Sequence, residues 1–165
     1  MSNVIIHYSA KLNRREWFLL KTFDLLNPLH GMIHRHRKPW GKSVDELRSQ
    51  PQNTLAYQLG NFLFENKLQP VPKAEKHDAY HVLLGYGTDI KEEAGMQFFL
   101  LGNGKRSPFT IGTSMLAAAV LPERFGYFYQ QFKRGIRSHA MANWNFEALL
   151  HDDYNSLVQK IATNY

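Results

Sequence analysis

The 165-residue chain contains no cysteine. This absence excludes disulfide bonds, thiolate nucleophiles, and zinc or iron–sulfur centres that are held by cysteine. Long apolar runs are also missing, because no stretch approaches the roughly 18 residues that a membrane-spanning helix needs. The first residues lack the apolar core of a signal peptide. Any metal centre in this protein must therefore be built from histidine, aspartate and glutamate.

Basic residues outnumber acidic ones by 20 to 14, which gives a formal charge of +6. Such a charge permits attraction to nucleic acid, to anionic lipid or to an acidic substrate. No recognisable nucleic-acid-binding module accompanies the charge, so we expect no nucleic-acid partner. The clearest basic cluster, HRHRKPWGK at residues 34–42, is typical of a solvated loop. Contact with a phosphate or a lipid headgroup is the alternative for this cluster.

Helix-start signals recur along the chain. Asn13 with Glu16, and Ser43 with Glu46, have the spacing of a capping box, in which each side chain bonds the backbone N–H of the other residue. Asp89 offers a further N-terminal cap. Prolines and glycines separate the segments that these signals open. The predicted helices cover about residues 14–27, 43–49, 53–68, 74–84, 89–101, 109–121, 123–135, 143–150 and 152–162.

This pattern predicts an all-α fold, a single-domain bundle of about eight helices over residues 1–165. The first helix is expected to end before Pro28, because proline lacks a backbone N–H and crowds the preceding turn. Only the segment NVIIHY, residues 3–8, has a pattern that allows a short strand.

Residues 109–132 form an apolar stretch in which two kinds of segment follow each other. The first, IGTSMLAAAVL, carries small side chains, which let neighbouring helices approach closely or leave a groove between them. The second places Phe125, Phe128, Tyr129 and Phe132 on one stripe. Aromatic stripes belong more often to the core than to a ligand site. The alternative is that the two segments enclose an apolar cavity for an elongated ligand.

The segment AEKHDAYHVLLGYGTDIKEEAG, residues 74–95, contains the clearest candidate site. A helix turns about 100° per residue, so His77 and His81 project from one face about 40° apart and can bind one ion together. Asp78 points to the flank of that face, where a carboxylate either joins the ion or orients a ligand. Glu93 lies beyond the GYGTD turn, which can fold it back towards His81.

Two imidazoles with one or two carboxylates suit zinc, iron(II) or manganese, and the spacing does not choose among them. Zinc would act as a Lewis acid, whereas a face of two histidines and one carboxylate would suit iron and oxygen chemistry. The simpler interpretation is a pair of half-exposed histidines near the end of a helix.

Residues 77–95 resemble the signature of the Coq-four family of coenzyme Q (ubiquinone) biosynthesis proteins, H-D-x-x-H-x(11)-E. His77, Asp78, His81 and Glu93 match its four defined positions. The run HVLLGYGTD also matches the family's apolar triplet, glycine and threonine after the second histidine.

The likeness extends more weakly to residues 51–66 and 132–161, so that about two-thirds of the chain takes part. Where this chain has Glu92, the family usually has a small residue. The adjacent Glu92 and Glu93 therefore leave open which carboxylate binds an ion. The chain is compact for the family and lacks a mitochondrial presequence, which indicates a bacterial relative.

The resemblance implies a mostly helical protein with a hydrophobic cavity for a prenyl tail and a divalent metal ion, zinc by resemblance, near the polar head. His77, His81 and Glu93 would hold the ion, with Asp78 as fourth ligand or orienting carboxylate. It implies removal of the C1 carboxyl of a polyprenylated hydroxybenzoate, with hydroxylation of that carbon. We expect a place in the bacterial cytoplasm, peripheral to the inner membrane, with a prenyl lipid and a quinone biosynthetic complex as partners. Self-pairing into a homodimer stays open.

Two other functions compete with a metal-dependent decarboxylase. The protein could be a non-catalytic prenyl-lipid-binding scaffold, in which the metal holds the head group or the fold. The His77–Asp78 doublet also suggests an HD-type phosphohydrolase, but that chemistry recruits further histidine and aspartate from other helices, and the sequence offers no convincing upstream partner. We favour the metal-dependent decarboxylase over the scaffold and the phosphohydrolase. The sequence identifies candidate metal ligands but no catalytic residue.

Overall fold

The computed structural model describes residues 13–33 and 38–162, and these contain eight α-helices, two short 3-10 helices and no strand. The predicted all-α fold is confirmed, whereas the predicted strand at residues 3–8 and part of the basic cluster, residues 34–37, lie outside the described residues. The helices are α1 (Arg14–Ile33), α2 (Val44–Arg48), α3 (Leu55–Glu65), α4 (Glu75–Leu84), α5 (Ile90–Gly102), α6 (Pro108–Val120), η1 (Pro122–Arg124), α7 (Phe125–Arg137), η2 (Ala148–His151) and α8 (Tyr154–Ala162).

The predicted capping residues begin their helices through local hydrogen bonds. The N–H of Asn13 donates to Oε2 of Glu16, and the N–H of Glu16 donates back to Oδ1 of Asn13, both at 2.9 Å. Ser43 and Glu46 form the same reciprocal pair at the start of α2. These bonds satisfy backbone donors that have no partner inside the helix, so the helix starts could be predicted from sequence.

Two predicted helix boundaries are wrong. Helix α1 does not end before Pro28 but continues through it to Ile33. Proline removes a single backbone donor, and the hydrogen bonds of the residues on both sides can still hold the helix together. The helix predicted for residues 143–150 is reduced to the 3-10 turn Ala148–His151.

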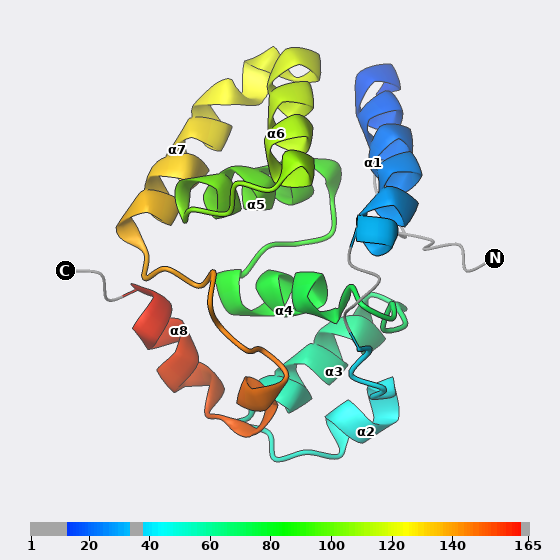
Figure 1. Cartoon of the computed structure of the whole chain (residues 1–165), viewed down its shortest axis with the longest axis vertical. Helices are drawn as coiled ribbons and strands as arrows, with labels where there is room; N and C mark the ends of the chain where they lie inside the picture. The colour runs from blue at the N-terminus through cyan, green and yellow to red at the C-terminus, as the bar shows by residue number, and fades with distance from the viewer. Residues whose placement is uncertain (1–12, 34–37, 163–165) are drawn as a thin grey trace.

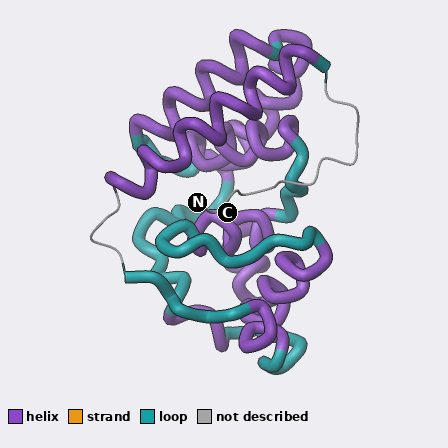
Figure 2. Tube along the Cα trace, turned by 90° about the vertical axis from the view of Figure 1, so that its right-hand side faces the viewer, coloured by secondary structure: helices purple, strands orange, loops and turns teal. Residues whose placement is uncertain are grey.

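The helices pack around two hydrophobic clusters that share α5. The lower cluster in Figure 1 joins α2, α3, α4 and α8 to Met96, Phe99 and Leu100 of α5. The upper cluster joins α1, α6 and α7 to Ile90, Ala94 and Phe98 of the same helix. Most of the loop structure belongs to the lower half (Figure 2). Since α5 contributes to both clusters, the two halves form one domain, and the contact between α4 and α5 lies at their junction.

Helices α5 and α7 approach each other closely because each presents a glycine to the other. A Cβ atom at Gly102 would collide with the backbone carbonyl of Phe132, and one at Gly135 would collide with that of Phe99. The residues of the predicted aromatic stripe on α7 differ in their burial. Phe128 is fully buried, whereas about half of the surface of Phe125 and of Tyr129 is exposed. The stripe is therefore only partly core, and the apolar cavity stays a prediction.

Candidate metal centre

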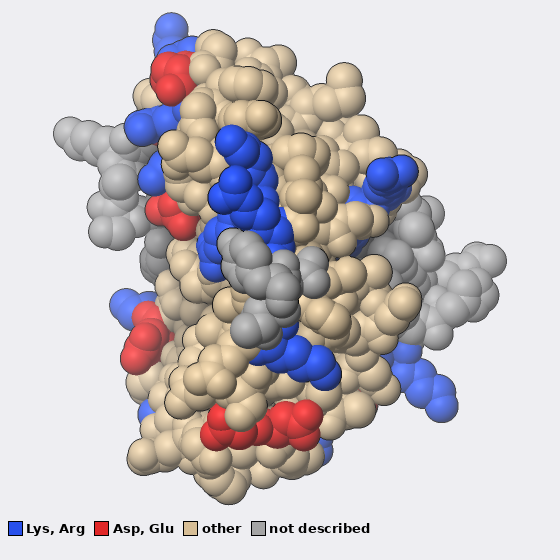
Figure 3. All heavy atoms as spheres, turned by 90° about the vertical axis from the view of Figure 1, so that its left-hand side faces the viewer, with Lys and Arg blue, Asp and Glu red and all other residues tan. Residues whose placement is uncertain are grey.

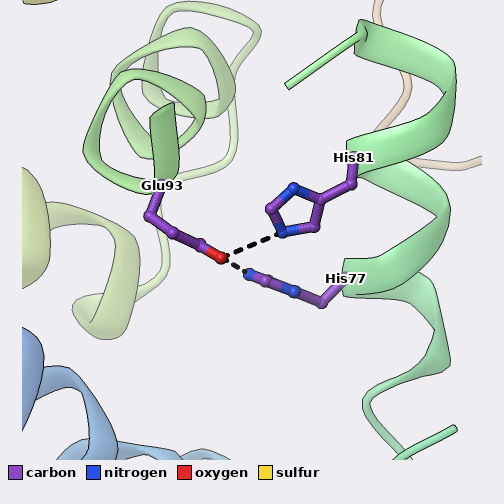
Figure 4. A group of neighbouring side chains, drawn as sticks. All are labelled: His77, His81 and Glu93. Atoms are coloured by element: carbon purple, nitrogen blue, oxygen red, sulfur yellow. Dashed lines mark ion pairs between the residues drawn. The ribbon is translucent and has the colours of Figure 1, made fainter. Parts of the chain in front are cut away.

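His77 and His81 project from one face of α4, as their spacing predicts (Figure 4). Their ring centroids are 4.8 Å apart, with the rings steeply inclined to each other. Only 3% of the surface of His81 is exposed, whereas His77 is half-buried. The interpretation of two half-exposed surface histidines therefore does not fit His81, and the open side of the site is the side of His77.

Glu93 on α5 faces both histidines. Asp89 caps this helix through hydrogen bonds from the N–H groups of Lys91 and Glu92, which places Glu93 in the first turn. Its Oε1 lies 3.1 Å from Nε2 of His81, and its Oε2 lies 3.4 Å from Nε2 of His77. The prediction that the turn between the helices returns this carboxylate to the histidines is confirmed.

The electrostatics of the group follow from burial of opposite charges. Burial by itself would lower the pKa of His77, but the carboxylates of Glu93 and Asp78 raise the pKa of this imidazole well above its ordinary value. Burial by itself would raise the pKa of Glu93, but His81 and His77 hold it well below the usual range. Without a metal ion, Glu93 is therefore ionised and His77 carries a proton.

The ring of His81 is fixed by two neighbours that the sequence analysis did not identify. Its Nδ1 lies 3.2 Å from the backbone carbonyl oxygen of Tyr86. A carbonyl can only accept, so we assign a proton to Nδ1, which leaves Nε2, the nitrogen that faces Glu93, as the atom of His81 that can bind an ion. Phe62 of α3 stacks on the other side of the ring, with centroids 5.3 Å apart. Neither neighbour carries a sequence signal, because a backbone carbonyl and a core aromatic residue are found in every helical protein.

The position of Gly85 explains how the Tyr86 carbonyl reaches His81. Gly85 ends α4 in the left-handed conformation, with φ of +71°. The N–H groups of Gly85 and of Tyr86 both donate to the carbonyl of His81. Glycine adopts this conformation readily because it has no Cβ. The residue that ends the helix thus also orients the histidine.

Asp78 lies beside the triad. Its Oδ1 is 3.8 Å from Nδ1 of His77, the nitrogen that faces away from Glu93. A carboxylate in this position orients an imidazole ligand and strengthens its basicity. The geometry therefore favours the orienting role for Asp78 over that of a fourth ligand.

Glu92 is directed away from the histidines, which answers the question of the two adjacent carboxylates. Its Oε1 accepts a hydrogen bond of 2.8 Å from the hydroxyl of Tyr127 on α7, and Nζ of Lys91 lies 3.4 Å away. Burial and the Glu92 carboxylate raise the pKa of Tyr127, so this hydroxyl remains a donor. Glu93 is thus the carboxylate that can join His77 and His81.

The donor set fits a single divalent cation. One ligand atom from each of His77, His81 and Glu93 can be chosen so that all three lie within 4.8 Å of one another. Ligands about 2.1 Å from a tetrahedral ion are separated by roughly 3.4 Å, close to the separations of each histidine from Glu93. Two histidines with one carboxylate is a ligand set that zinc enzymes use, with a remaining position for water or substrate.

Comparison with known proteins adds information about the fold. No protein-family model matches the chain, and neither does any curated protein. The crystal structure of a Nostoc punctiforme protein with the provisional name of ubiquinone biosynthesis protein is similar, with a TM-score of 0.61 and 16% sequence identity. The match covers 93% of this chain and 83% of that one. At this level of identity, the likeness shows that the two chains share a fold.

Proposed function

We propose that this chain is a metal-dependent protein of quinone biosynthesis, which binds a polyprenylated hydroxybenzoate and removes its C1 carboxyl group. The observation that carries the proposal is the convergence of His77, His81 and Glu93 from two helices on one point. The H-D-x-x-H-x(11)-E spacing and the name of the Nostoc protein with the same fold support the class of substrate.

The residues of the site have distinct roles in this proposal. Nε2 of His77, Nε2 of His81 and the Glu93 carboxylate would hold the ion, and Asp78 would keep the ring of His77 in place. A bound zinc ion would supply Lewis-acid chemistry to the carboxylate or phenolic oxygen of the substrate, while iron or manganese suits the same donors. Burial of His81 and Glu93 excludes water from the floor of the site, and the ring would enter on the side of His77.

Decarboxylation breaks the bond between C1 and the carboxyl carbon and leaves its electron pair in the aromatic ring. In a simple decarboxylation, a proton then takes the place of CO2 at C1. In an oxidative decarboxylation, one atom of dioxygen enters at C1 as a hydroxyl group, and the other leaves as water after taking up two protons and two electrons from an added reductant. The two reactions differ by one oxygen atom in the ring product, which mass spectrometry distinguishes.

The test uses purified protein loaded with zinc, iron(II) or manganese and a hydroxybenzoate that carries a short prenyl chain. Released CO2 and the mass of the ring product are measured without dioxygen, and with dioxygen together with a two-electron reductant. We expect CO2 from at least one metal-loaded form and none from the His81→Ala variant. Absence of CO2 from every metal-loaded form contradicts the activity. Saturable binding of the prenylated ring without CO2 would instead identify a lipid-binding scaffold.

The alternative of an HD-type phosphohydrolase receives less support. That chemistry needs further histidine and aspartate ligands from other helices. Across residues 13–23 and 38–162, whose side chains the structure describes, the metal-ligating group consists of His77, His81 and Glu93. We therefore propose the quinone pathway and not phosphate ester hydrolysis.

No helix in the described part of the chain is long and apolar enough to cross a membrane. We include in the proposal a peripheral association with the cytoplasmic surface of a bacterial membrane, because a polyprenyl chain is insoluble in water. Trp17 and Phe18 of α1 and Met115 of α6 support it, since all three are more than half exposed on helices that pack against each other. Trp17→Ser with Met115→Ser should lower the fraction that sediments with lipid vesicles, and an unchanged fraction contradicts this surface. Membership of a quinone biosynthetic complex and homodimer formation stay predictions.

A further inference from the structure

A groove of about 470 Å³ lies between the C-terminal parts of α7 and α8. Among the side chains that line it are three apolar and three basic ones: Leu83, Val158, Ile161, Lys133, Arg134 and Arg137. Leu83 follows His81 by two residues, which places it about 200° around α4, on the side opposite the histidines. The groove is therefore separate from the candidate metal centre.

The groove carries positive charge without acidic neighbours on its own helices. Neither α7 nor α8 contains an aspartate or glutamate. None of Lys133, Arg134 and Arg137 forms an ion pair with a described acid. Figure 3 shows Lys and Arg side chains gathered in a column on the face that α7 and α8 form. Three neighbouring cations that pair with no acid in the described part of the chain attract a multivalent anion.

The three cations differ in how firmly they are held. Nη2 of Arg134 donates a hydrogen bond of 2.8 Å to the carbonyl of Leu84, so this guanidinium is fixed and its charge belongs to the groove permanently. Nζ of Lys133 lies 5.1 Å from the ring centroid of Tyr129, an exposed contact that a ligand can replace. Lys133 and Arg137 are exposed and keep their hydrogen-bond donors accessible.

The basic residues are not needed to cap the end of α7, where cations often compensate unpaired carbonyls. The buried amide of Asn103 does this instead, because its Nδ2 donates to the carbonyls of Gly135, Ser138 and His139. The N–H of His139 in turn donates to the carbonyl of Ile161 at the end of α8, at 2.9 Å. Helix-end carbonyls beside the groove are thus occupied, and the cations remain available for a ligand.

We infer that this groove binds the phosphate group of an amphiphilic lipid, with the apolar chain lying on Leu83, Val158 and Ile161. A phosphate monoester carries close to two negative charges and three acceptor oxygens, which match an ammonium and two guanidinium groups. The apolar lining residues distinguish the ligand from inorganic phosphate or a polar phosphate ester. The ligand comes either from solution, as a lipid phosphate monomer, or from a bilayer, as a headgroup.

The test measures binding of octyl phosphate below its micelle concentration by isothermal titration, on protein treated with EDTA so that no metal competes for the ligand. Lys133→Gln with Arg137→Gln removes two donors and leaves the fixed Arg134 intact. Lys42→Gln with Arg106→Gln is the matched control, because it removes the same charge from exposed positions outside the groove. Far-ultraviolet circular dichroism confirms that each variant keeps its helicity, and the two single variants serve as replacements if the double variant does not fold.

We expect the groove variant to bind octyl phosphate at least about tenfold more weakly than the wild type, whereas the control binds normally, since charge-assisted hydrogen bonds depend on position. Val158→Asn should weaken octyl phosphate but not inorganic phosphate. Equal losses in the groove variant and the control, or no loss in either, would overturn the inference.

The source of the phosphate is decided by a second measurement. Sedimentation with phosphatidylcholine vesicles that contain phosphatidic acid, lost in the groove variant, identifies a bilayer headgroup. Binding of octyl phosphate without vesicle sedimentation identifies a free lipid phosphate. Absence of both kinds of binding overturns the inference, and it leaves the metal centre untouched because the protein is metal-free in these measurements.

Discussion

The carbonyl oxygen of Tyr86 lies 3.2 Å from Nδ1 of His81. This contact ties the end of helix α4 to the chemistry of the site, because it selects the tautomer in which Nε2 can bind an ion. The two residues are five apart in sequence, and only the left-handed turn at Gly85 brings the carbonyl back to the ring. The backbone conformation at Gly85 thus orients His81 so that its Nε2 can bind an ion.

Removal of either histidine should abolish metal binding. His77→Ala or His81→Ala takes away one of three donors, so we expect the purified variant to lose stoichiometric zinc while its helicity is retained. Elemental analysis with circular dichroism checks this. His151→Ala, at an exposed histidine outside the metal-ligating group, should keep full metal content. A His81→Ala protein with stoichiometric zinc would refute the ligand assignment.

The two adjacent glutamates should behave differently. Glu93→Gln removes the carboxylate that faces both histidines, and we expect metal affinity to fall by more than about tenfold, the loss that even outer-shell partners cause. Glu92→Gln should leave affinity close to that of the wild type, because Glu92 is bonded to Tyr127. Competition with a zinc-binding dye measures both constants. A larger loss for Glu92→Gln would reverse the assignment.

Gly85→Ala should lower the free energy of unfolding by about 1–2 kcal/mol, the cost of placing a Cβ in a left-handed conformation. A Cβ at this position meets no atom within 4 Å, so the cost is purely conformational. Gly112→Ala is the control, because Gly112 lies inside α6 with equally open surroundings, and alanine should stabilise the helix by about 0.5–1 kcal/mol. Urea denaturation of metal-free protein gives both values, and equal effects of the two substitutions would contradict the role of Gly85.

Metal affinity should rise with pH across neutrality, and binding should release a proton. The raised pKa of His77 means that this imidazole is protonated in the metal-free protein, and the proton must leave before Nε2 binds an ion. Calorimetric titration of zinc in buffers of different ionisation enthalpy counts the protons released. Glu93→Gln should release fewer protons, because the carboxylate that holds the His77 proton is gone.

The stability of the metal-free protein should fall with rising pH over the range in which the metal affinity rises. The protonated imidazole of His77 stabilises the fold fully below pH 6.5, the pKa of histidine in the unfolded chain. This stabilisation is lost as the pH rises through the raised pKa of His77 in the folded protein. The ionised carboxylate of Glu93 stabilises the fold fully above pH 4.5, the pKa of glutamate in the unfolded chain. This stabilisation is lost as the pH falls towards the lowered pKa of Glu93 in the folded protein. Both contributions are present between these two unfolded values. Thermal unfolding should therefore show that the wild type loses more stability than Glu93→Gln between about pH 5.5 and pH 8.5. Parallel curves would contradict the pairing.

The helix ends show which features are local enough to predict. The capping boxes of Asn13 and Ser43 and the glycine that ends α4 depend on hydrogen bonds within one helical turn, so residue type and spacing suffice to identify them. The continuation of α1 through Pro28 could not be predicted, because the local cost of proline is weighed against the rest of a 20-residue helix.

The sequence alone determined the helical class, most of the helix starts and the display of His77 and His81 on one face, because these follow from backbone hydrogen bonding and from the helical repeat. Only the tertiary structure decided that Glu93 and not Glu92 reaches them, that the Tyr86 carbonyl orients His81, and that α7 and α8 form a basic groove. These relationships join residues from separate helices. They depend on how α4, α5 and α7 pack, and helical spacing carries no information about packing between helices.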